Sequence, residues 1–302
     1  MQESSQNRLR EEAGKLLSAA AVEVVVGYGD GHGGDGVRPL FARTPDEAAG
    51  LVWNDACVHN LATYLSREPC RQILLRGGKV GIVAKGCDAR ALVVLLQEGQ
   101  IARESVHVIG MVCDGVLDPG AAVSGGTAGS SGAVLPKCRQ CEVQTPPLYD
   151  TLVGDPAGAA AAEGDPLEDV KDLQSMSLEE RWSFWTGHLA RCIKCYACRQ
   201  ACPMCYCATC ITEKSEPQWI DKPSHLKGAL AYHLIRAMHL AGRCVSCGEC
   251  GRACPMDIPV DKISRYLAGQ VEEAFDYKAG MDPEATPAFR TYREDDPEDF
   301  IR

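Results

Sequence analysis

The sequence predicts a two-domain α/β protein, in which an N-terminal Rossmann-like open sheet is followed by a C-terminal α-helical domain. Two observations predict this fold class. Up to residue 110, β-branched runs alternate with segments whose apolar residues recur at helical spacing, a pattern typical of open sheets. After residue 190, cysteines recur in two runs of identical spacing, separated by a segment with helical periodicity.

The N-terminal domain is predicted to begin with a helix over residues 9–20, followed by a strand over residues 22–26. The glycine-rich stretch 27–36 comes next, at the position where α/β folds commonly bind phosphates. This stretch is either a cofactor loop or a flexible connection. Thr44 and Pro45 then have the pattern of a helix start.

A βαβ unit follows in the N-terminal domain. Residues 79–84 and 106–110 have strand patterns, and residues 89–98 between them have a helical pattern. The low-complexity stretch 116–135 is predicted to be a mobile loop. The unit therefore places two parallel strands side by side, with their carboxyl ends at one edge of the sheet.

The composition of the connecting segments sets the domain boundaries. Residues 154–166 are rich in alanine and glycine, as interdomain linkers often are. We therefore predict an α/β domain at 1–153, a linker at 154–175, a cysteine-organised domain at 176–275 and an acidic C-terminal tail at 276–302. The tail is expected to be extended, either wrapped on a surface or solvated.

The two cysteine runs share the pattern Cys-x2-Cys-x2-Cys-x3-Cys-Pro, at residues 192–203 and 244–255. This is the ligand run of bacterial ferredoxins, in which three cysteines hold one 4Fe-4S cube and the fourth binds the other cube. The C-terminal domain is therefore predicted to be diferredoxin-like, with two 4Fe-4S clusters. Electron transfer is the function that such clusters imply.

The ligand sets are predicted to cross between the two runs. A proline directly after the fourth cysteine stops the local helix and turns that cysteine toward the partner cube. Cluster one is assigned to Cys192, Cys195, Cys198 and Cys254. Cluster two is assigned to Cys244, Cys247, Cys250 and Cys202.

Four further cysteines are predicted to meet at the carboxyl edge of the sheet. Cys87 follows one strand of the βαβ unit, Cys113 follows the other, and Cys138 and Cys141 form a Cys-x2-Cys pair. We predict that they hold a third 4Fe-4S cluster. A zinc ion would use the same four thiolates, and a turn with unmetallated thiols is the third interpretation. Two singletons are expected to be small buried side chains, Cys57 and Cys70.

The insertion between the two runs contains three more cysteines and a helix. Cys205, Cys207 and Cys210 either hold part of a further cluster, replace a ligand, or line the cubes as hydrogen-bonding thiols. The helix is predicted over residues 225–242. Its apolar face is predicted to be Leu226, Leu230, Leu234 and Met238, with His233, Arg236 and His239 around the other side. The two histidines are interpreted as surface or packing residues rather than ligands.

Two groups of side chains are expected around the clusters. An apolar stripe on the helix before the first run is interpreted as a lid packed over the cubes: Leu178, Trp182, Trp185 and Leu189. Five cations flank the ligands: Arg191, Lys194, Arg199, Arg243 and Arg252. These cations either offset cluster charge and raise the reduction potential, or form an exposed charged rim.

The bulk composition excludes several classes. A net charge of −10 and a pI near 5.2 argue against nucleic-acid binding, which requires a basic face. The sequence contains no run of about 18 apolar residues, so no membrane span is expected. Of the 17 cysteines, eight lie in the two ligand runs, and no apolar signal region is seen near Met1, so the reducing cytoplasm is the expected compartment.

Several of these motifs together resemble one known family. The stretch 79–90, the strand-end residues 113–115, the pair in 137–141 and the two cysteine runs resemble the beta-subunit family of coenzyme F420 hydrogenases and formate dehydrogenases. The resemblance covers most of residues 7–300. Within the family, the chain is similar to bacterial iron-sulfur subunits that accompany heterodisulfide-reductase-like or hydrogenase-like complexes.

The resemblance implies an iron-sulfur electron-transfer subunit of a cytoplasmic multisubunit oxidoreductase. Other subunits of a redox complex, including a flavin-containing heterodisulfide-reductase-like subunit, are the implied partners, and the catalytic chemistry is expected in a partner. The alternative is that the α/β domain binds flavin as FAD and itself exchanges electrons with a nicotinamide or deazaflavin carrier. A metal-sensing or scaffold protein is the third class.

Overall fold

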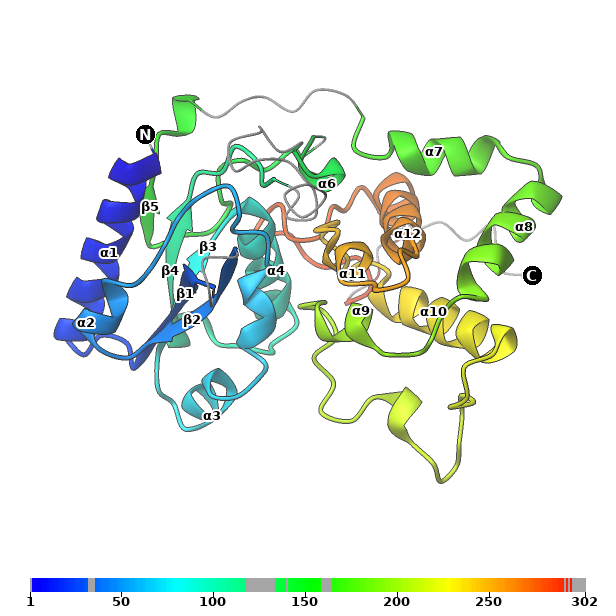
Figure 1. Cartoon of the computed structure of the whole chain (residues 1–302), viewed down its shortest axis with the longest axis horizontal. Helices are drawn as coiled ribbons and strands as arrows, with labels where there is room; N and C mark the ends of the chain where they lie inside the picture. The colour runs from blue at the N-terminus through cyan, green and yellow to red at the C-terminus, as the bar shows by residue number, and fades with distance from the viewer. Residues whose placement is uncertain are drawn as a thin grey trace. The chain divides into compact units, whose positions relative to one another are not determined.

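The computed structural model describes residues 2–31, 36–117, 134–139, 141–158, 165–290, 292 and 294. It divides the chain into two compact units, Met1–Gly164 and Asp165–Arg302. The first unit contains the sheet, and the second is helical (Figure 1). This arrangement confirms the predicted fold class, and the division falls inside the segment predicted to be a linker.

The sheet of the first unit has five strands in the order β2-β1-β3-β4-β5. The strands are β1 (Val24–Asp30), β2 (Val37–Ala42), β3 (Val80–Ala84), β4 (Val106–Met111) and β5 (Thr151–Val153). β1, β3, β4 and β5 are parallel, and β2 pairs antiparallel with β1. β1, β3 and β4 are almost completely buried, which explains why they have continuous apolar sequences rather than alternating ones.

The helices of the first unit support this sheet. They are α1 (Gln2–Ser18), α2 (Pro45–Ala48), α3 (Cys70–Leu75), α4 (Gly86–Gln97) and α6 (Pro136–Arg139), with short 3-10 turns at Leu61–Tyr64, Arg103–Ser105 and Pro156–Gly158. The predicted βαβ unit is β3-α4-β4, with Ile82 opposite Val108. α4 is buried along most of its length, because it crosses over the sheet between the two strands.

The glycine-rich stretch differs from its prediction. β1 continues through Asp30 and pairs with β2 as an antiparallel hairpin, so residues 27–30 are strand, not loop; residues 32–35 lie outside the described residues. A Cβ atom on Gly27 would lie 2.4 Å from Leu51 Cδ2, so this glycine serves close packing against the sheet. Among the described residues, the element that follows β1 is the strand β2 and not a helix, which differs from the strand-to-helix turn of a phosphate loop.

A buried polar network joins β1 to the turn between β3 and α4. Lys85 Nζ lies 2.9 Å from Asp88 Oδ2 and donates to the carbonyl of His59 at 2.8 Å and to the Tyr28 hydroxyl. Asp88 also accepts a bond from the backbone N–H of Leu61 at 2.6 Å. Because each charge is paired and hydrogen-bonded, this network can persist in the interior, and it rigidifies the edge of the sheet that carries Cys87.

The second unit is built from helices. They are α7 (Glu168–Ser175), α8 (Leu178–Leu189), α9 (Ala197–Gln200), α10 (Leu226–Leu240), α11 (Glu249–Arg252) and α12 (Val260–Phe275), with a 3-10 turn at Ile211–Glu213. α8 begins with a capping box between Ser177 and Glu180. α10 packs against α8 and α12, and Figure 1 shows α10 passing beside the short helices α9 and α11.

Two predicted faces in this unit are wrong in part: Leu226, Leu230 and Leu189 do pack in the core, but other members do not. On α10, Leu234 and Met238 are 55% and 63% exposed, whereas His233 and Arg236 are 4% and 7% exposed. The buried face of α10 contacts the cysteine turns through hydrogen-bonding side chains such as His233 and Arg236. The distribution of apolar residues along the helix therefore does not identify its buried face. On α8, Leu178 and Trp182 are exposed, which contradicts the lid interpretation for these two residues. Leu189 is the buried member of that stripe.

The described part of the C-terminal tail packs on the second unit. Tyr277 and Ala279 are buried, and the Phe289 ring lies edge-on to Phe275 at 5.6 Å.

α7 is held to α12 by an ion pair between Arg265 and Asp169 at 2.8 Å. In the part of the chain that the structure describes, none of the helices is both long and apolar enough to cross a bilayer.

Candidate iron-sulfur centres

The two cysteine runs fold into the same kind of turn. In the first run, Lys194 and Tyr196 have φ values of 52° and 60°, and in the second run, Ser246 and Gly248 have φ values of 55° and 67°. These left-handed residues flank the second cysteine of each run and precede α9 and α11, respectively. Backbone that alternates in this way turns its N–H groups into a concave surface, a feature of many iron-sulfur sites.

The first cavity is lined by Cys192, Cys195, Cys198 and Cys254, three cysteines of the first run and the last of the second. It contains about 330 Å³ of empty space, part of which is open to solvent. Cys195 is exposed, and Cys198 is buried. The cavity therefore has one cysteine at the surface and one in the interior.

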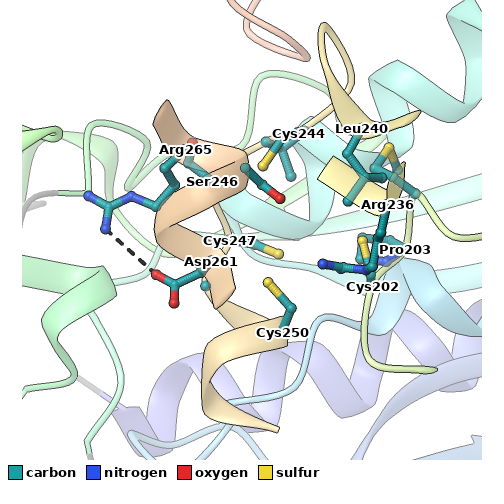
Figure 2. A pocket seen from close by; sticks show the side chains of 14 residues that line it. Cys202, Pro203, Arg236, Leu240, Cys244, Ser246, Cys247, Cys250, Asp261 and Arg265 are labelled. Carbon is teal, nitrogen blue, oxygen red and sulfur yellow. Dashed lines mark ion pairs between the residues drawn. The ribbon is translucent and has the colours of Figure 1, made fainter. Parts of the chain in front are cut away.

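The second cavity is lined by Cys202, Cys244, Cys247 and Cys250, and it contains about 380 Å³ of empty space, including open solvent. Figure 2 shows the sulfur atoms of these cysteines around this space. Each cavity thus receives its fourth cysteine from the other run, as crossed ligand sets require. The ligand assignment itself stays a prediction.

The chemistry of these cavities suits a cluster of positively charged iron. Burial raises the pKa of the Cys198 and Cys250 thiols, so a thiolate at these positions needs a nearby positive charge. Iron supplies that charge when it is coordinated by sulfur. Four thiols around one cavity, on turns with inward N–H groups, fit a 4Fe-4S cube.

Neutral groups contact the thiols of the first cavity. Cys192 Sγ lies 3.4 Å from His233 Nε2, and Cys198 Sγ lies 3.5 Å from the Tyr232 hydroxyl oxygen. Burial, reinforced by the charges of Arg236 and Lys194, lowers the pKa of His233 to about 4. The imidazole is therefore neutral at pH 7, and it donates or accepts according to its tautomer.

A buried cation contacts the second cavity. Arg236 is 7% exposed, lines this cavity, and donates from Nη2 to the carbonyl oxygen of Cys198 at 3.1 Å. The sequence interpretation missed it as a functional residue. The spacing of the residues could have indicated its burial. Tyr232, Arg236 and Leu240 recur every four residues on α10, so they lie on one face of the helix, and all three are buried.

The five predicted flanking cations have other partners. Arg199 pairs with Glu213 at 2.8 Å, Arg252 pairs with Glu249 at 2.7 Å, and Arg191 contacts His188 Nδ1 at 2.8 Å. Lys194 is buried and donates to the carbonyl of Asp221, and the Arg243 guanidinium lies 5.9 Å from the centre of the Tyr206 ring. Neutralisation by carboxylates reduces what Arg199 and Arg252 can do for cluster charge.

The three extra cysteines have different surroundings. The Cys205 thiol is hydrogen-bonded to the Cys202 thiol and to Arg236. Cys207 is exposed. The backbone N–H of Cys210 donates to Glu213 at 3.0 Å. Of the interpretations weighed from sequence, a thiol that hydrogen-bonds a ligand describes Cys205.

The proposed third set lies at the carboxyl edge of the sheet, as predicted from the strand order. Cys87 is in the first turn of α4, and Cys113 follows β4, where its backbone N–H donates to Gln144 at 3.0 Å. Burial raises the pKa of Cys113 to about 11, against the charge of Lys85; Cys138 and Cys141 also raise it. The backbone turn from Cys138 to Cys141 closes at 3.3 Å. Cys113, Cys138 and Cys141 therefore lie within electrostatic reach of one another.

The two single cysteines of the first unit lie in its interior. Cys57 and Cys70 are fully buried, as expected of small interior side chains.

Residues 118–133 of the predicted mobile loop lie outside the described residues. Among the described residues, no three His, Cys, Asp or Glu side chains converge closely enough to hold a single metal ion.

Comparisons with known proteins agree with the cysteine turns. Residues 191–259 match the family model of the 4Fe-4S dicluster domain. The chain is 25% identical to the F420-dependent formate dehydrogenase subunit beta of Methanocaldococcus jannaschii over an alignment of 339 positions, which covers 86% of this chain and 87% of that protein. It is 24% identical to the F420-dependent formate dehydrogenase 1 subunit beta of Methanococcus maripaludis, with 90% of each chain covered.

A solved structure of the F420-reducing [NiFe] hydrogenase complex from Methanosarcina barkeri also matches, with 15% identity and a TM-score of 0.33. The match covers 46% of this chain and 58% of that chain, and at this TM-score it supports no conclusion about fold. The dicluster match confirms the iron-sulfur clusters predicted from the two cysteine runs and their electron-transfer role; the third cluster stays a prediction. The two formate dehydrogenase subunits confirm the resemblance predicted from the motifs, along most of this chain.

Proposed function

We propose that this chain is the iron-sulfur electron-transfer subunit of a cytoplasmic multisubunit oxidoreductase of the F420-dependent formate dehydrogenase and hydrogenase type. The observation that carries the proposal is the pair of cavities, each lined by three cysteines of one run and one of the other. The similarity to formate dehydrogenase beta subunits supports the type of complex. Other subunits of that complex, including a flavin-containing one, are the proposed partners.

Within this function, cluster one is held by Cys192, Cys195, Cys198 and Cys254, and cluster two by Cys244, Cys247, Cys250 and Cys202. The cubes supply one-electron redox chemistry when bound. The chain's own residues hold the thiols in place, exclude water from buried ligands such as Cys198, and set the charge around each cavity. Cys195 is exposed, so a cluster that it helped to hold would lie near the surface, within reach of a partner.

A third 4Fe-4S cluster on Cys87, Cys113, Cys138 and Cys141 is part of the proposal. Support comes from the shared edge of the sheet and from the electrostatic proximity of Cys113, Cys138 and Cys141. A Cβ on Gly86 would lie 1.8 Å from the carbonyl oxygen of Val143. This close approach places the segment just after Cys141 against the first turn of α4, which carries Cys87.

Iron, sulfide and flavin analysis of the anaerobically reconstituted full chain tests the proposal. We expect about eight irons from the two ferredoxin runs, and about twelve if the third cluster forms. Cys138→Ser should then lower twelve to about eight, while the control Cys70→Ser, at a buried position apart from the proposed ligands, leaves the count unchanged.

Each outcome of this measurement has a distinct meaning. An iron content near eight that is unchanged in Cys138→Ser would contradict the third cluster and would agree with the two clusters of the ferredoxin runs. Fewer than about four irons in the wild-type chain would contradict the electron-transfer proposal itself. Stoichiometric flavin released from the isolated chain would favour the alternative in which the α/β unit itself exchanges electrons with a nicotinamide or deazaflavin carrier.

A further inference from the structure

Arg236 is a buried cation without a carboxylate partner among the described residues. Its contacts are the carbonyl oxygen of Cys198, at 3.1 Å from Nη2, and the thiol of Cys205, while its Nε atom is buried and has no hydrogen-bond partner. A guanidinium in the interior is costly unless opposite charge offsets the loss of hydration. The surrounding groups that can become negative are cysteine thiols: Cys250, Cys202, Cys205 and Cys198.

Two of these four thiols line the second cavity, and one lines the first. Cys202 and Cys250 line the second cavity together with Arg236 itself, whereas Cys198 lines the first. Figure 2 shows the guanidinium extending into the space between Cys202 and Cys250. Arg236 therefore lies in the wall of the second cavity and contacts a residue that lines the first.

The other two charged residues that line the second cavity, Arg265 and Asp261, form ion pairs. Arg265 lies 3.7 Å from Asp261 and 2.8 Å from Asp169, and Lys262 lies 3.3 Å from Asp169. Two cations thus face two carboxylates. Among the described residues that line this cavity, Arg236 is the cation that has no carboxylate partner.

We propose that Arg236 is a positioning residue that makes cluster two the higher-potential cluster of the pair, by placing an uncompensated positive charge against its ligands. The inference rests on the proposed electron-transfer function. Reduction adds one negative charge to a cluster, so a nearby buried cation stabilises the reduced form. Cys205 extends the effect, because it connects Arg236 to the ligand Cys202 through hydrogen bonds, and hydrogen bonds to ligand sulfur also favour reduction.

Cluster one has weaker stabilisation of this kind. Its ligands Cys192 and Cys198 contact neutral groups, His233 and Tyr232, and hydrogen bonds from charged donors are about twice as strong as neutral ones. Lys194, a buried cation that lines the first cavity, donates to the carbonyl of Asp221. An electron shared between the two clusters therefore resides mainly on cluster two.

An EPR-monitored redox titration of the reconstituted full chain tests this order. Cys195→Ser and Cys247→Ser first assign the two signals to cluster one and cluster two. In Arg236→Gln, we expect the ratio of reduced to oxidised cluster two, at the wild-type midpoint, to fall about tenfold, which is ~59 mV for a one-electron couple. The ratio for cluster one should fall less, and Arg236→Lys should keep both ratios near wild type.

Arg199→Gln is the matched control. Arg199 lies between Cys198 and Cys202 in the sequence and is also an arginine near both runs, but its charge is paired with the half-exposed Glu213. We expect its removal to change either ratio by less than about threefold, since a paired surface charge contributes little. An equal shift in Arg199→Gln and Arg236→Gln, or a larger shift of cluster one than of cluster two, would overturn the inference.

Iron content keeps the outcomes distinguishable. If Arg236→Gln does not hold as much iron as the wild-type chain, Arg236→Lys decides: wild-type iron content with wild-type potentials supports a role for the charge, whereas failure to load clusters shows a packing role and overturns the inference. A wild-type chain that loads no clusters contradicts the proposed function instead. Loaded clusters with unchanged potentials in Arg236→Gln overturn the inference about Arg236 alone.

Discussion

The two cysteine cavities have the same backbone design but different neighbours. Both use a pair of left-handed residues and a short helix, α9 or α11, to turn three cysteines inward. The first cavity then meets neutral side chains from α10, and the second meets the charged Arg236 from the next turn of the same helix. A repeated ligand motif therefore fixes what binds, while one helix placed between the repeats sets how the two sites differ.

The largest expected effect comes from breaking the crossed ligand sets. Cys202→Ser lies in the first run but should remove the signal of cluster two, and Cys254→Ser lies in the second run but should remove the signal of cluster one. Each should lower the iron content by about four, because a cube that lacks a thiolate ligand is held less tightly. Iron analysis and EPR of each variant measure this effect.

Cys205 must be controlled in that experiment. It is hydrogen-bonded to Cys202 and could replace the missing ligand, so the double variant Cys202→Ser/Cys205→Ser closes that route. Loss of cluster one from Cys202→Ser, with cluster two at full intensity, would show that each run binds a cube with its own four cysteines. Circular dichroism should show that the α/β unit stays folded in every case.

A smaller effect is expected from removing the imidazole at the first cavity. His233→Leu removes the group 3.4 Å from Cys192 Sγ while keeping an apolar side chain at a buried position. Since a neutral hydrogen bond contributes about 1 kcal/mol, we expect the ratio of reduced to oxidised cluster one to fall about fivefold. Cluster two should change by much less.

His233→Gln is the control for this variant, because an amide keeps hydrogen-bonding capacity at that position. It should restore the potential of cluster one at least in part. A shift of cluster two that equals the shift of cluster one would mean that the two cavities are not tuned separately.

The smallest effect is expected from Tyr232→Phe. This change removes a single hydroxyl group, 3.5 Å from Cys198 Sγ, and leaves the ring packed against Tyr196 at 5.1 Å. The long contact predicts a change of about twofold in the ratio for cluster one, measured by the same redox titration. A tenfold change would show that neutral donors tune these clusters as strongly as the buried arginine, which would remove the difference between the cavities.

The sequence by itself determined the local features of this protein. The spacing of the cysteines predicted two 4Fe-4S clusters, because three thiolates two residues apart can reach one cube from a single turn of chain. The β-branched run of β3 and the helical period of α4 predicted the βαβ unit, since buried parallel strands are apolar throughout. These features depend on neighbours in the chain.

The tertiary structure decided the features that depend on distant residues. Residues 27–30 joined β1 because β2 pairs with them, and local glycine content could not reveal that pairing. α10 has leucines on one side and His233 and Arg236 on another, and only packing against the cysteine turns shows which side is buried. The sequence therefore predicted which cysteines hold iron, whereas the folded chain placed the charge of Arg236 in the wall of the second cavity.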